Sequence, residues 1–376
     1  MIDMGKRVCY NTHISEVQVM DEKKIPLLPP DVELETKKVL KQLSGAHRAL
    51  AELKGYAGTI PNQHILVNAV TIREAKDSSA IENIITTHDD LYKAMSDARD
   101  ATGDAKEVVS YRRALWKGYE SVKSQEMLTT NTMIEIQRMI ERNNAGIRKL
   151  PGTVLRNERT GETVYTPPGG EEEIRRLLDN LERYINQDED EIDQLVKLSV
   201  IHYQFESIHP FYDGNGRTGR IMNVLYLVLK GLLDSPILYL SKYINRNRQE
   251  YYRLLQDVRL HDHWEEWVIY LLKGIEETGI EALKLVKEIN REIQAMTGEI
   301  KEELPEIYSK ELVDLLFYEF YTKISYVQEG LAVTRKTASK YLSSLEDKGF
   351  LVSEKIGRER IYQNKRLYDL VRKDES

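Results

Sequence analysis

Cysteine is almost absent from this 376-residue sequence. The single residue, Cys9, cannot form an internal disulfide, and a zinc site built from cysteine ligands is excluded. No apolar run approaches the roughly 18 to 20 residues that a membrane-spanning helix needs, and the opening MIDMGKRVCY lacks the apolar centre of a signal peptide. A surplus of positive charge is also lacking, since the net charge is −7. We therefore expect a cytoplasmic protein without a membrane partner, whose whole surface does not bind nucleic acid nonspecifically.

What the sequence does contain is a dense group of functional residue types between Ser207 and Arg220, SIHPFYDGNGRTGR. Gly214, Asn215 and Gly216 permit the positive φ angles that let successive backbone N–H groups converge on an anion. They stand where the next helix starts, and the N-terminus of a helix favours the same negative charge. The stretch is therefore suited to hold a phosphate.

The charged residues of the stretch suit a phosphate that carries a metal ion. Asp213 can ligate Mg²⁺, which usually enters such sites through one or two carboxylates and the substrate phosphates. Arg217 and Arg220 are three residues apart, so their guanidinium groups can project on one side toward phosphate oxygens. An unperturbed His209 titrates near neutrality and can take a proton from an attacking hydroxyl. A solvated loop with a capping aspartate would explain one or two of these residues, but not all of them.

The glycines between Gly214 and Gly219 also spell G-x-G-x-x-G, the fingerprint of dinucleotide-binding folds. That motif requires a strand immediately before it. The preceding apolar residues recur at helical spacing instead, which disfavours a dinucleotide site; they are Leu198, Ile201, Phe205 and Ile208.

HPFYDGNGRTGR resembles the signature of the Fic family, His-x-Phe-x-Asp/Glu-Gly-Asn-Gly-Arg-x-x-Arg, and matches it at every defined position. The family's usual reaction is adenylylation (AMPylation), in which AMP passes from ATP to a hydroxyl side chain of a protein and pyrophosphate leaves. Such an in-line attack on the α-phosphorus depends mostly on positioning and charge neutralisation. The resemblance implies these roles: His209 as general base, Phe211 as anchor of the loop in the core, Asp213 as Mg²⁺ ligand, Gly214, Asn215 and Gly216 as phosphate cradle, and Arg217 and Arg220 as ligands of the β and γ phosphates.

A second element of the resemblance lies upstream, in the segment SSAIEN. One class of Fic proteins carries Ser/Thr-x-x-x-Glu-Gly/Asn on a helix before the catalytic core, where the glutamate pairs with the second signature arginine and excludes the γ-phosphate. Ser78, Glu82 and Asn83 match this pattern, so the resemblance implies an inhibitory pair of Glu82 with Arg220. The pattern recurs around Glu329, but only the first copy lies upstream of the signature. The alternative for Glu82 is a solvent-facing residue at a helix end.

Helical periodicity predicts most of the chain before the signature. After an irregular arm over residues 1–35 we expect helices over 33–54 and 62–77, with a break at Gly55, and further helices over 85–145 with a break near Gly103. Candidate core positions in this region are Leu91, Ala94, Met95, Val108, Tyr111, Leu115 and Tyr119.

The residue pattern changes over 153–166, where β-branched and polar residues alternate on both sides of a turn-like segment at 159–162. This pattern predicts a β-hairpin. In the Fic family a hairpin at this place, the flap, aligns the target segment by strand addition. Thr163, Val164 and Tyr165 are therefore candidates for target docking, and an ordinary surface hairpin is the alternative.

Two helices are expected on either side of the signature, over 195–208 and 221–233. The second is apolar almost all round, so it should be the buried centre of an all-helical bundle. An acidic segment over 171–193 precedes them as a helix and a solvated linker. His202 is most simply a residue of this bundle. The histidines His261 and His263 face apart on a helix and lack a third ligand, so no zinc site is expected there.

The segment 239–260 is rich in tyrosine and arginine, and most of these tyrosines should be packing residues with their hydroxyls at the edge of the core. By resemblance, Asn247 and Tyr251 fall where the family contacts the adenosine part of the nucleotide.

The C-terminal part reads as a helix over 311–321, a helix-turn-helix over 324–348 and two short strands. This order resembles a winged helix, whose second helix enters the major groove. Residues 331–373 hold eleven Lys/Arg against five Asp/Glu, a local surplus of six positive charges. The surplus favours DNA as a partner, but winged helices also pair proteins, and no base-contacting residue can be assigned from the sequence.

The length and a hydrophobic content of 41% predict two or three domains with real cores. We expect a mainly α fold: an N-terminal helical region over 1–112, a Fic-type bundle with a hairpin flap over 113–300, and a winged helix over 301–376. The expected function is a self-inhibited, Mg²⁺-dependent protein adenylyltransferase that uses ATP to modify a Tyr, Ser or Thr hydroxyl of a target protein, itself included. The alternatives are a nucleotide-responsive DNA-binding regulator and a Fic enzyme that removes AMP or uses another nucleotide donor. A homodimer is left open.

Overall fold

The structure is a computed structural model that describes residues 25–60, 62–87, 90–91, 94, 103–156, 161–187, 191–356 and 359–372. Several sequence predictions fall outside these ranges: the first part of the N-terminal arm, the core position Met95, the first half of the hairpin turn, and the middle of the acidic linker.

Helices dominate the described chain. They are α1 (Lys37–Ala57), α2 (Gln63–Ile81), α4 (Gly103–Gln125), α5 (Thr130–Glu141), α6 (Glu171–Asn186), α7 (Gln194–Ile208), α8 (Asn215–Leu229), α9 (Ser241–Arg246), α10 (Arg248–His261), α11 (Trp264–Glu303), α12 (Lys310–Tyr318), α13 (Ile324–Gly330), α14 (Arg335–Asp347) and α15 (Lys365–Arg372).

The strands form two small antiparallel sheets. β1 (Leu155–Arg156) pairs with β2 (Thr163–Tyr165), with Leu155 opposite Tyr165. β3 (Tyr321–Lys323), β5 (Glu359–Gln363) and β4 (Val352–Ile356) form the second sheet in that order.

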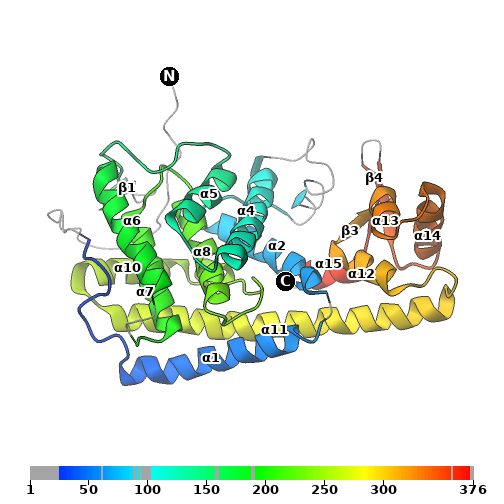
Figure 1. The fold of residues 1–376 in the computed structure, drawn as a ribbon, viewed down its shortest axis with the longest axis horizontal. Coiled ribbons are helices and arrows are strands. Elements are labelled where there is room, and N and C mark those ends of the chain that lie inside the picture. The colour runs from blue at the N-terminus through cyan, green and yellow to red at the C-terminus, as the bar shows by residue number, and fades with distance from the viewer. Residues whose placement is uncertain are drawn as a thin grey trace.

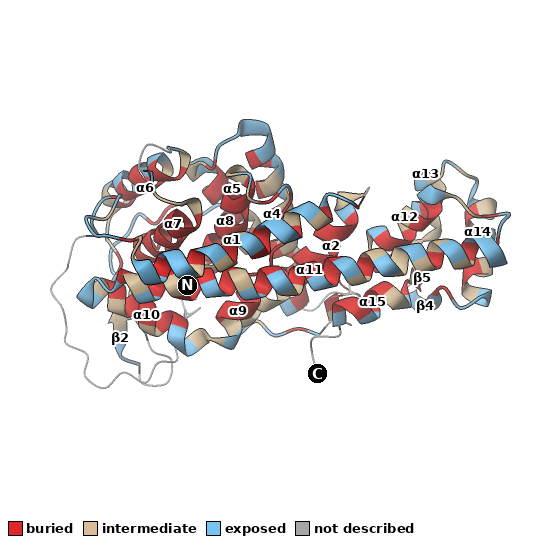
Figure 2. Cartoon of the chain, turned by 90° about the horizontal axis from the view of Figure 1, so that it is seen from below, coloured by how far each residue is buried: buried red, intermediate tan, exposed pale blue. Residues whose placement is uncertain are grey.

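The long helix α11 runs beneath the whole molecule (Figure 1). Its 40 residues span roughly 60 Å at 1.5 Å per residue. The α4–α8 bundle lies over one half of α11, the C-terminal elements lie over the other end, and α1 packs along α11 from below. Figure 2 shows pale blue and red bands along α1 and α11, because each helix has one exposed and one buried face. This amphipathic spacing is what the sequence predicts for α1.

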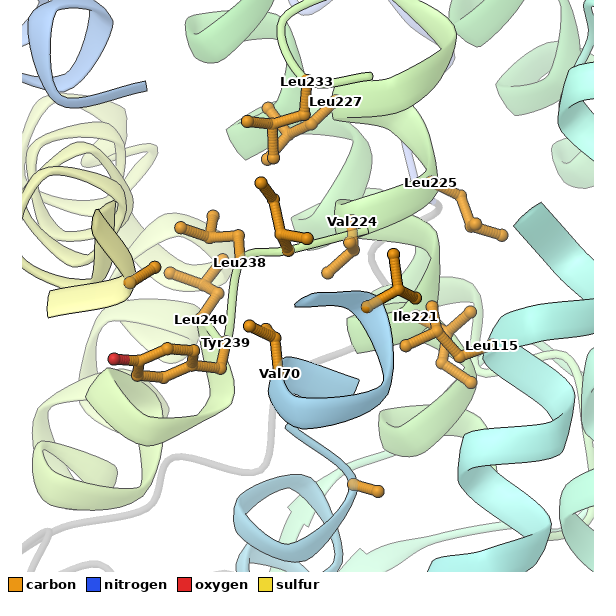
Figure 3. Close-up of a cluster of buried hydrophobic side chains, with 14 of the residues drawn as sticks. Val70, Leu115, Ile221, Val224, Leu225, Leu227, Leu233, Leu238, Tyr239 and Leu240 are labelled. Carbon is orange, nitrogen blue, oxygen red and sulfur yellow. The ribbon is translucent and has the colours of Figure 1, made fainter. Parts of the chain in front are cut away.

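Helix α8 is the centre of the bundle, as its apolar sequence predicts. Every residue from 217 to 228 is buried. Figure 3 shows Ile221 of α8 beside Leu115 of α4, and Leu227 of α8 beside Leu233, with Val70 of α2 in the same cluster. Because α8 is enclosed on all sides, a close-packed core fixes the position of its N-terminus.

The C-terminal elements form the predicted helix-turn-helix, α13 and α14, followed by the hairpin of β4 and β5. Thr334 caps α14 by accepting a hydrogen bond from the Thr337 N–H at 3.2 Å. The strand β3 and the helix α15 extend this arrangement and are not anticipated from the sequence. Buried Asn364 joins them, since its N–H donates to the Phe320 carbonyl at 2.9 Å and its side chain donates to the Leu316 carbonyl at 3.0 Å.

Helix α2 connects the C-terminal elements to the bundle. Near its start, the Asn68 side chain donates to the Tyr318 carbonyl at 2.7 Å. One turn further on, the Arg73 Nε donates to the Val371 carbonyl at 3.0 Å. Helix α2, whose last residue precedes Glu82, is therefore held in its first half and middle by contacts with α12 and α15.

The mainly α fold with a small hairpin and a C-terminal winged helix is confirmed. Some local predictions are wrong: Gly55 lies inside α1, the second helix continues to Ile81, and Tyr119 is only half-buried. The other described core candidates are buried. Both limits of the three-part division fall inside continuous helices, α4 and α11, so the division stays a proposal. No helix among the described residues is both long enough and apolar enough to cross a bilayer.

Candidate functional site

Helix α7 ends at His209, which adopts the left-handed conformation with φ 47°. The Arg148 side chain is fully buried behind this end. Its Nε donates to the His209 carbonyl at 2.7 Å, and its Nη2 donates to the Ile208 carbonyl at 3.3 Å. Because these carbonyls would otherwise be unpaired at the helix end, Arg148 fixes where the His209 backbone lies.

The loop between the two helices is closed by Phe211 and Asn215. Phe211 is fully buried, as an anchoring role requires. The Phe211 N–H donates to the Asn215 side-chain oxygen, and the Asn215 amide donates to the Phe211 carbonyl, both at 2.8 Å. The side chain of Asn215 therefore holds the loop.

The glycines of the loop serve different purposes. Gly214 has φ 80° and stands directly before α8. The expectation that Asn215 and Gly216 also take positive φ is wrong, because they are the first two residues of α8. At Gly216 a Cβ atom would collide with the Glu82 carboxylate and come within 2.9 Å of Arg220. The anion-binding feature is therefore the N-terminus of α8 together with the turn at Gly214.

One pocket joins α2, α7, α8 and α10 at this point. It brings together many of the residues that the sequence singled out, with two further ones, Glu206 and Tyr252. The lining residues are Glu82, Glu206, His209, Asp213, Gly214, Asn215, Gly216, Arg217, Arg220, Tyr251 and Tyr252.

Arg220 is paired with the end of α2. Its Nη2 donates to Glu82 Oε1 at 2.8 Å and to the Ser78 carbonyl at 3.0 Å, and its Nε donates to Ser78 Oγ at 2.8 Å. Burial is the largest single effect and opposes the charged guanidinium, but Glu82, Tyr251, Glu206 and Tyr111 together outweigh it and raise the pKa of Arg220. The next residue, Asn83, accepts a hydrogen bond from Arg248 at 3.0 Å. Ser78 and Glu82 thus hold the arginine at the floor of the pocket.

Arg217 is also paired, which the sequence does not indicate. Its Nη1 lies 3.0 Å from Glu107 of α4, and its Nη2 lies 2.5 Å from Glu141 at the end of α5. Asp213 is 3.8 Å away. The two signature arginines therefore do not share one open side, because each is engaged by its own acidic partners.

Asp213 is the one carboxylate of the signature, and its side chain is 30% exposed. Its Oδ1 accepts a hydrogen bond from the Gly214 N–H at 2.7 Å. Among the described residues no group of three or more His, Cys, Asp and Glu side chains is arranged to hold a metal. A single carboxylate at an anion-binding helix end nevertheless fits Mg²⁺, which takes its remaining ligands from phosphates and water.

His209 is buried, and burial lowers the pKa of its imidazole from 6.5 to about 3. The cations Arg148 and Arg259 add to this lowering, and the Glu206 carbonyl opposes it. The expectation that His209 titrates near neutrality is wrong, because desolvation penalises the charged form. The imidazole is therefore neutral at physiological pH, which is the form that accepts a proton.

On the α10 side, Tyr251 is buried, and its hydroxyl lies 2.9 Å from His202 Nε2. His202 Nδ1 lies 3.1 Å from the Asn223 amide. Burial lowers the pKa of His202 to about 3, so it is a neutral residue of the bundle, as predicted. Asn247 does not line the pocket; it precedes α10, and its amide donates to the Tyr243 carbonyl at 2.9 Å.

The hairpin β1–β2 is held by hydrogen bonds to α7 and α10. The Tyr165 hydroxyl donates to the Ser207 carbonyl at 2.8 Å, and the Gln256 amide donates to the Val164 carbonyl at 2.6 Å. The Arg259 guanidinium lies 3.9 Å from the centre of the Tyr165 ring. Thr163 is exposed. The hairpin is thereby fixed beside the end of α7 and the pocket.

Sequence reasoning misses four residues that build this site: Arg148, Glu107, Glu141 and Glu206. Each lies outside the signature. No spacing rule joins Glu107 to Arg217 across 110 residues. Only Glu206 carries a local signal, since it stands one helical turn before His209.

Comparisons with known proteins point to one family. The model of the Fic/DOC family matches residues 127–227, and the model of the Fic/DOC family N-terminal region matches residues 40–120. The C-terminal domain model of SoFic-like protein adenylyltransferases matches residues 293–367.

Curated relatives and solved structures agree with these matches. A probable protein adenylyltransferase of Aquifex aeolicus is 29% identical over 187 residues, which are 48% of this chain and 55% of that protein. A protein adenylyltransferase of Caenorhabditis elegans is 30% identical over 98 residues, which are 26% of this chain and 18% of that protein. The chain thus spans about half or less of the length of these relatives. A Fic family protein from Desulfovibrio desulfuricans has a similar fold, with a TM-score of 0.55 at 19% identity over 87% of this chain and 96% of that chain.

Proposed function

We propose, from the premise that the chain belongs to the Fic/DOC family, that it is a protein adenylyltransferase that transfers AMP from ATP to a Tyr, Ser or Thr hydroxyl of a protein. The observation that carries this proposal is the meeting of a neutral imidazole, His209, with the N-terminus of α8 in one pocket. The names of the relatives support the reaction class.

In the proposed reaction, the oxygen of the target hydroxyl attacks the α-phosphorus of ATP. A bond forms between that oxygen and the α-phosphorus, the bond from the α-phosphorus to the bridging oxygen breaks, and pyrophosphate leaves. His209 takes the hydroxyl proton, for which its neutral form is required. The N–H groups at the start of α8 and the guanidinium of Arg217 stabilise the negative charge of the phosphates.

Asp213 would hold Mg²⁺, which when bound neutralises phosphate charge. Phe211 and Asn215 hold the loop, so that His209 and the N-terminus of α8 keep their positions relative to each other. Asn247 and Tyr251 stay proposed contacts of the adenosine. Of the two, Tyr251 has the support of lining the pocket.

We propose further that the enzyme inhibits itself through Glu82. The carboxylate of Glu82 pairs with the guanidinium of Arg220, to which the γ-phosphate of ATP would bind. Ser78 holds Arg220 in the same place, and Asn83 ends the helix with a left-handed residue. Displacing Glu82 would free Arg220 for the phosphate.

The hairpin would present the target. β2 would add a backbone strand from the target protein beside Thr163, Val164 and Tyr165, the strand-addition mode of recognition. The hydrogen bond from Tyr165 to Ser207 supports this role, because it fixes the hairpin at a residue only two positions before His209.

The test is incubation of the full chain carrying Glu82→Gly with ATP labelled at the α-phosphate and a cell lysate. We expect a labelled protein, and the added change His209→Ala should abolish the label. Label that persists undiminished in the double variant contradicts the proposed role of His209.

DNA binding through residues 301–376 is a second proposal. It has the support of Arg335, Lys336 and Lys340, which are exposed on α14. Other basic residues of this region pair with acids instead, such as Arg366 with Glu299 at 2.5 Å. Binding of the full chain to duplex DNA should weaken as salt rises, and no binding at low salt would leave a protein as the partner of this surface. The cytoplasmic location and a homodimer stay predictions from the sequence.

A further inference from the structure

A buried row of polar side chains leads from Arg220 away from the pocket and into the core. Arg220 Nε donates to Ser78 Oγ of α2 at 2.8 Å. The Ser78 hydroxyl in turn hydrogen-bonds the Tyr111 hydroxyl of α4, which donates to Glu74 Oε1 at 2.9 Å. Ser78, Tyr111 and Glu74, here named the polar relay, are each at most 1% exposed.

Three helices fix the members of the polar relay. Glu74 and Ser78 are four residues apart on α2, so their side chains lie on one face of that helix. Tyr111 of α4 places its hydroxyl between them. At the far end, Glu74 accepts hydrogen bonds from the N–H and the hydroxyl of Ser241, the first residue of α9.

The hydrogen bonds of the polar relay all run in one direction. An arginine can only donate and a carboxylate can only accept. Burial, with the Glu74 carboxylate beside it, raises the pKa of Tyr111 well above 10, so Tyr111 keeps its proton and gives it to Glu74. Toward Ser78 it must therefore accept. Each hydroxyl thus accepts from the Arg220 side and donates toward Glu74, an order in which neighbouring bonds strengthen one another.

The polar relay holds Arg220 from the side that faces the core. Ser78 Oγ takes Nε, and the Ser78 carbonyl takes one hydrogen of Nη2 at 3.0 Å. The other edge of the guanidinium faces the pocket, where Glu82 lies 2.8 Å from Nη2. A Cβ atom at Gly216, the second residue of α8, would lie 2.9 Å from Nη1. The free edge is therefore turned toward the proposed phosphate site.

The polar relay and Glu82 have different consequences for Arg220. Glu82 pairs with the edge that a phosphate would use, whereas Ser78 Oγ binds Nε and leaves that edge open. Stability alone does not require a polar row in the core, because apolar side chains of the same shape are often at least as stabilising. What the row adds is one fixed orientation of the guanidinium.

We propose that Ser78, Tyr111 and Glu74 are positioning residues that hold Arg220 in the orientation required to bind the γ-phosphate once Glu82 has left. This inference rests on the proposed function, because it requires ATP in this pocket. It extends the site to Tyr111 and Glu74, two side chains that do not line the pocket.

The experiment compares the dissociation constants of ATP and ADP, which differ by the γ-phosphate, by calorimetry in the presence of Mg²⁺. The full chain carries Glu82→Gly and His209→Ala throughout, so that Arg220 is free and no ATP is consumed. The measurement is made at pH 8, because burial raises the pKa of Glu74 to about 7 and the carboxylate is wanted. This chain should bind ATP roughly tenfold more tightly than ADP, the effect of a charge-assisted hydrogen bond.

Added changes in the polar relay should lower this ATP preference. Ser78→Ala removes the bond to Nε and should lower it about fivefold. Tyr111→Phe acts one step further away and should lower it about threefold. Glu74→Gln should lower it less than Tyr111→Phe does, since an amide oxygen still accepts but without charge. Because Tyr111 acts through Ser78, the double variant should match Ser78→Ala alone.

Tyr226→Phe is the matched control. Tyr226 is as buried as Tyr111 and lies on α8 with Arg220, but its hydroxyl donates to Gln194 of α7. The loss of this hydrogen bond should lower the stability and leave the ATP preference unchanged. Circular dichroism establishes that each variant is folded.

Two results overturn the inference without touching the proposed function. One is an ATP preference that Tyr111→Phe leaves unchanged or lowers no more than Tyr226→Phe does. The other is a double variant in which the two losses multiply, because Tyr111 would then act independently of Ser78. Labelling by the chain with Glu82→Gly alone is measured alongside from α-labelled ATP. If that chain neither labels a protein nor binds ATP, the proposed function itself fails, and the inference fails with it.

Discussion

Replacing Glu82 by glycine should make the protein less stable and more active. The Glu82 carboxylate lies 2.8 Å from Arg220 Nη2, and the two side chains are 16% and 2% exposed. Breaking a buried ion pair typically costs about 3–5 kcal/mol. Here Arg220 keeps both of its hydrogen bonds to Ser78, and the pocket admits water, so we expect about 2 kcal/mol. For a chain of this size that lowers Tm by a few degrees.

The same 2 kcal/mol sets the gain in activity. A γ-phosphate that must displace Glu82 from Arg220 loses that free energy, which corresponds to about 30-fold in affinity. Transfer of AMP from ATP labelled at the α-phosphate should therefore rise by about this factor at low ATP concentration. Differential scanning fluorimetry with and without ATP gives the stability, and labelling of the chain itself gives the activity.

The chain supplies its own control. Glu329 stands in the same sequence pattern on α13, but it is exposed and far from the pocket residues. Glu329→Gly should leave labelling unchanged. The reasoning is refuted if Glu82→Gly lowers Tm as expected while labelling stays the same or falls, because the pair would then be structural.

Other changes separate binding, proton transfer and target docking. His209→Ala should abolish transfer while ATP still raises Tm, because the phosphate site at α8 is intact; loss of the ATP effect on Tm would contradict this. Since the pKa of His209 is about 3, lowering the pH through 6.5 should not reduce the rate of transfer. A pH-rate profile with a midpoint near pH 6.5 would contradict burial of the imidazole. Glu206 has a folded pKa of about 7 against 4.5 in the unfolded chain, so the folded state holds the extra proton and stability falls as pH rises from 4.5 to 7. Glu206→Gln removes this loss and should be more stable above pH 7 by up to about 3 kcal/mol, as measured by urea unfolding. Tyr165→Phe removes the hydrogen bond to Ser207 and should slow transfer to a protein target several-fold with an unchanged dissociation constant for ATP; an equal change in both would place the effect in the nucleotide site.

The sequence predicts the features that depend on neighbouring residues. The helices on either side of the signature follow from apolar residues at helical spacing, and the burial of α8 follows from its lack of a polar face. The hairpin follows from alternation in a segment of changed composition. A single glycine does not break a long amphipathic helix, which is why Gly55 lies inside α1. A three-residue strand such as β3 carries too little pattern to be recognised.

The parts that the sequence does not predict depend on contacts between distant segments. Arg217 meets Glu141 across 76 residues, and Arg148 reaches the end of α7 across 61. The low pKa of His209 and the high pKa of Glu206 come from burial, which only the packed bundle creates. The pair of Glu82 with Arg220 is the exception: it joins residues 138 apart, and a resemblance of two short motifs was enough to expect it.

The central claim is that the α-phosphate of ATP moves to a protein hydroxyl whose proton His209 accepts. The most direct test gives the full chain carrying Glu82→Gly either α-labelled or γ-labelled ATP, with and without His209→Ala. The account predicts protein label from the α-phosphate only, released pyrophosphate in equal amount, and no label after His209→Ala. Label from the γ-phosphate, or α-label that survives the loss of His209, would contradict it.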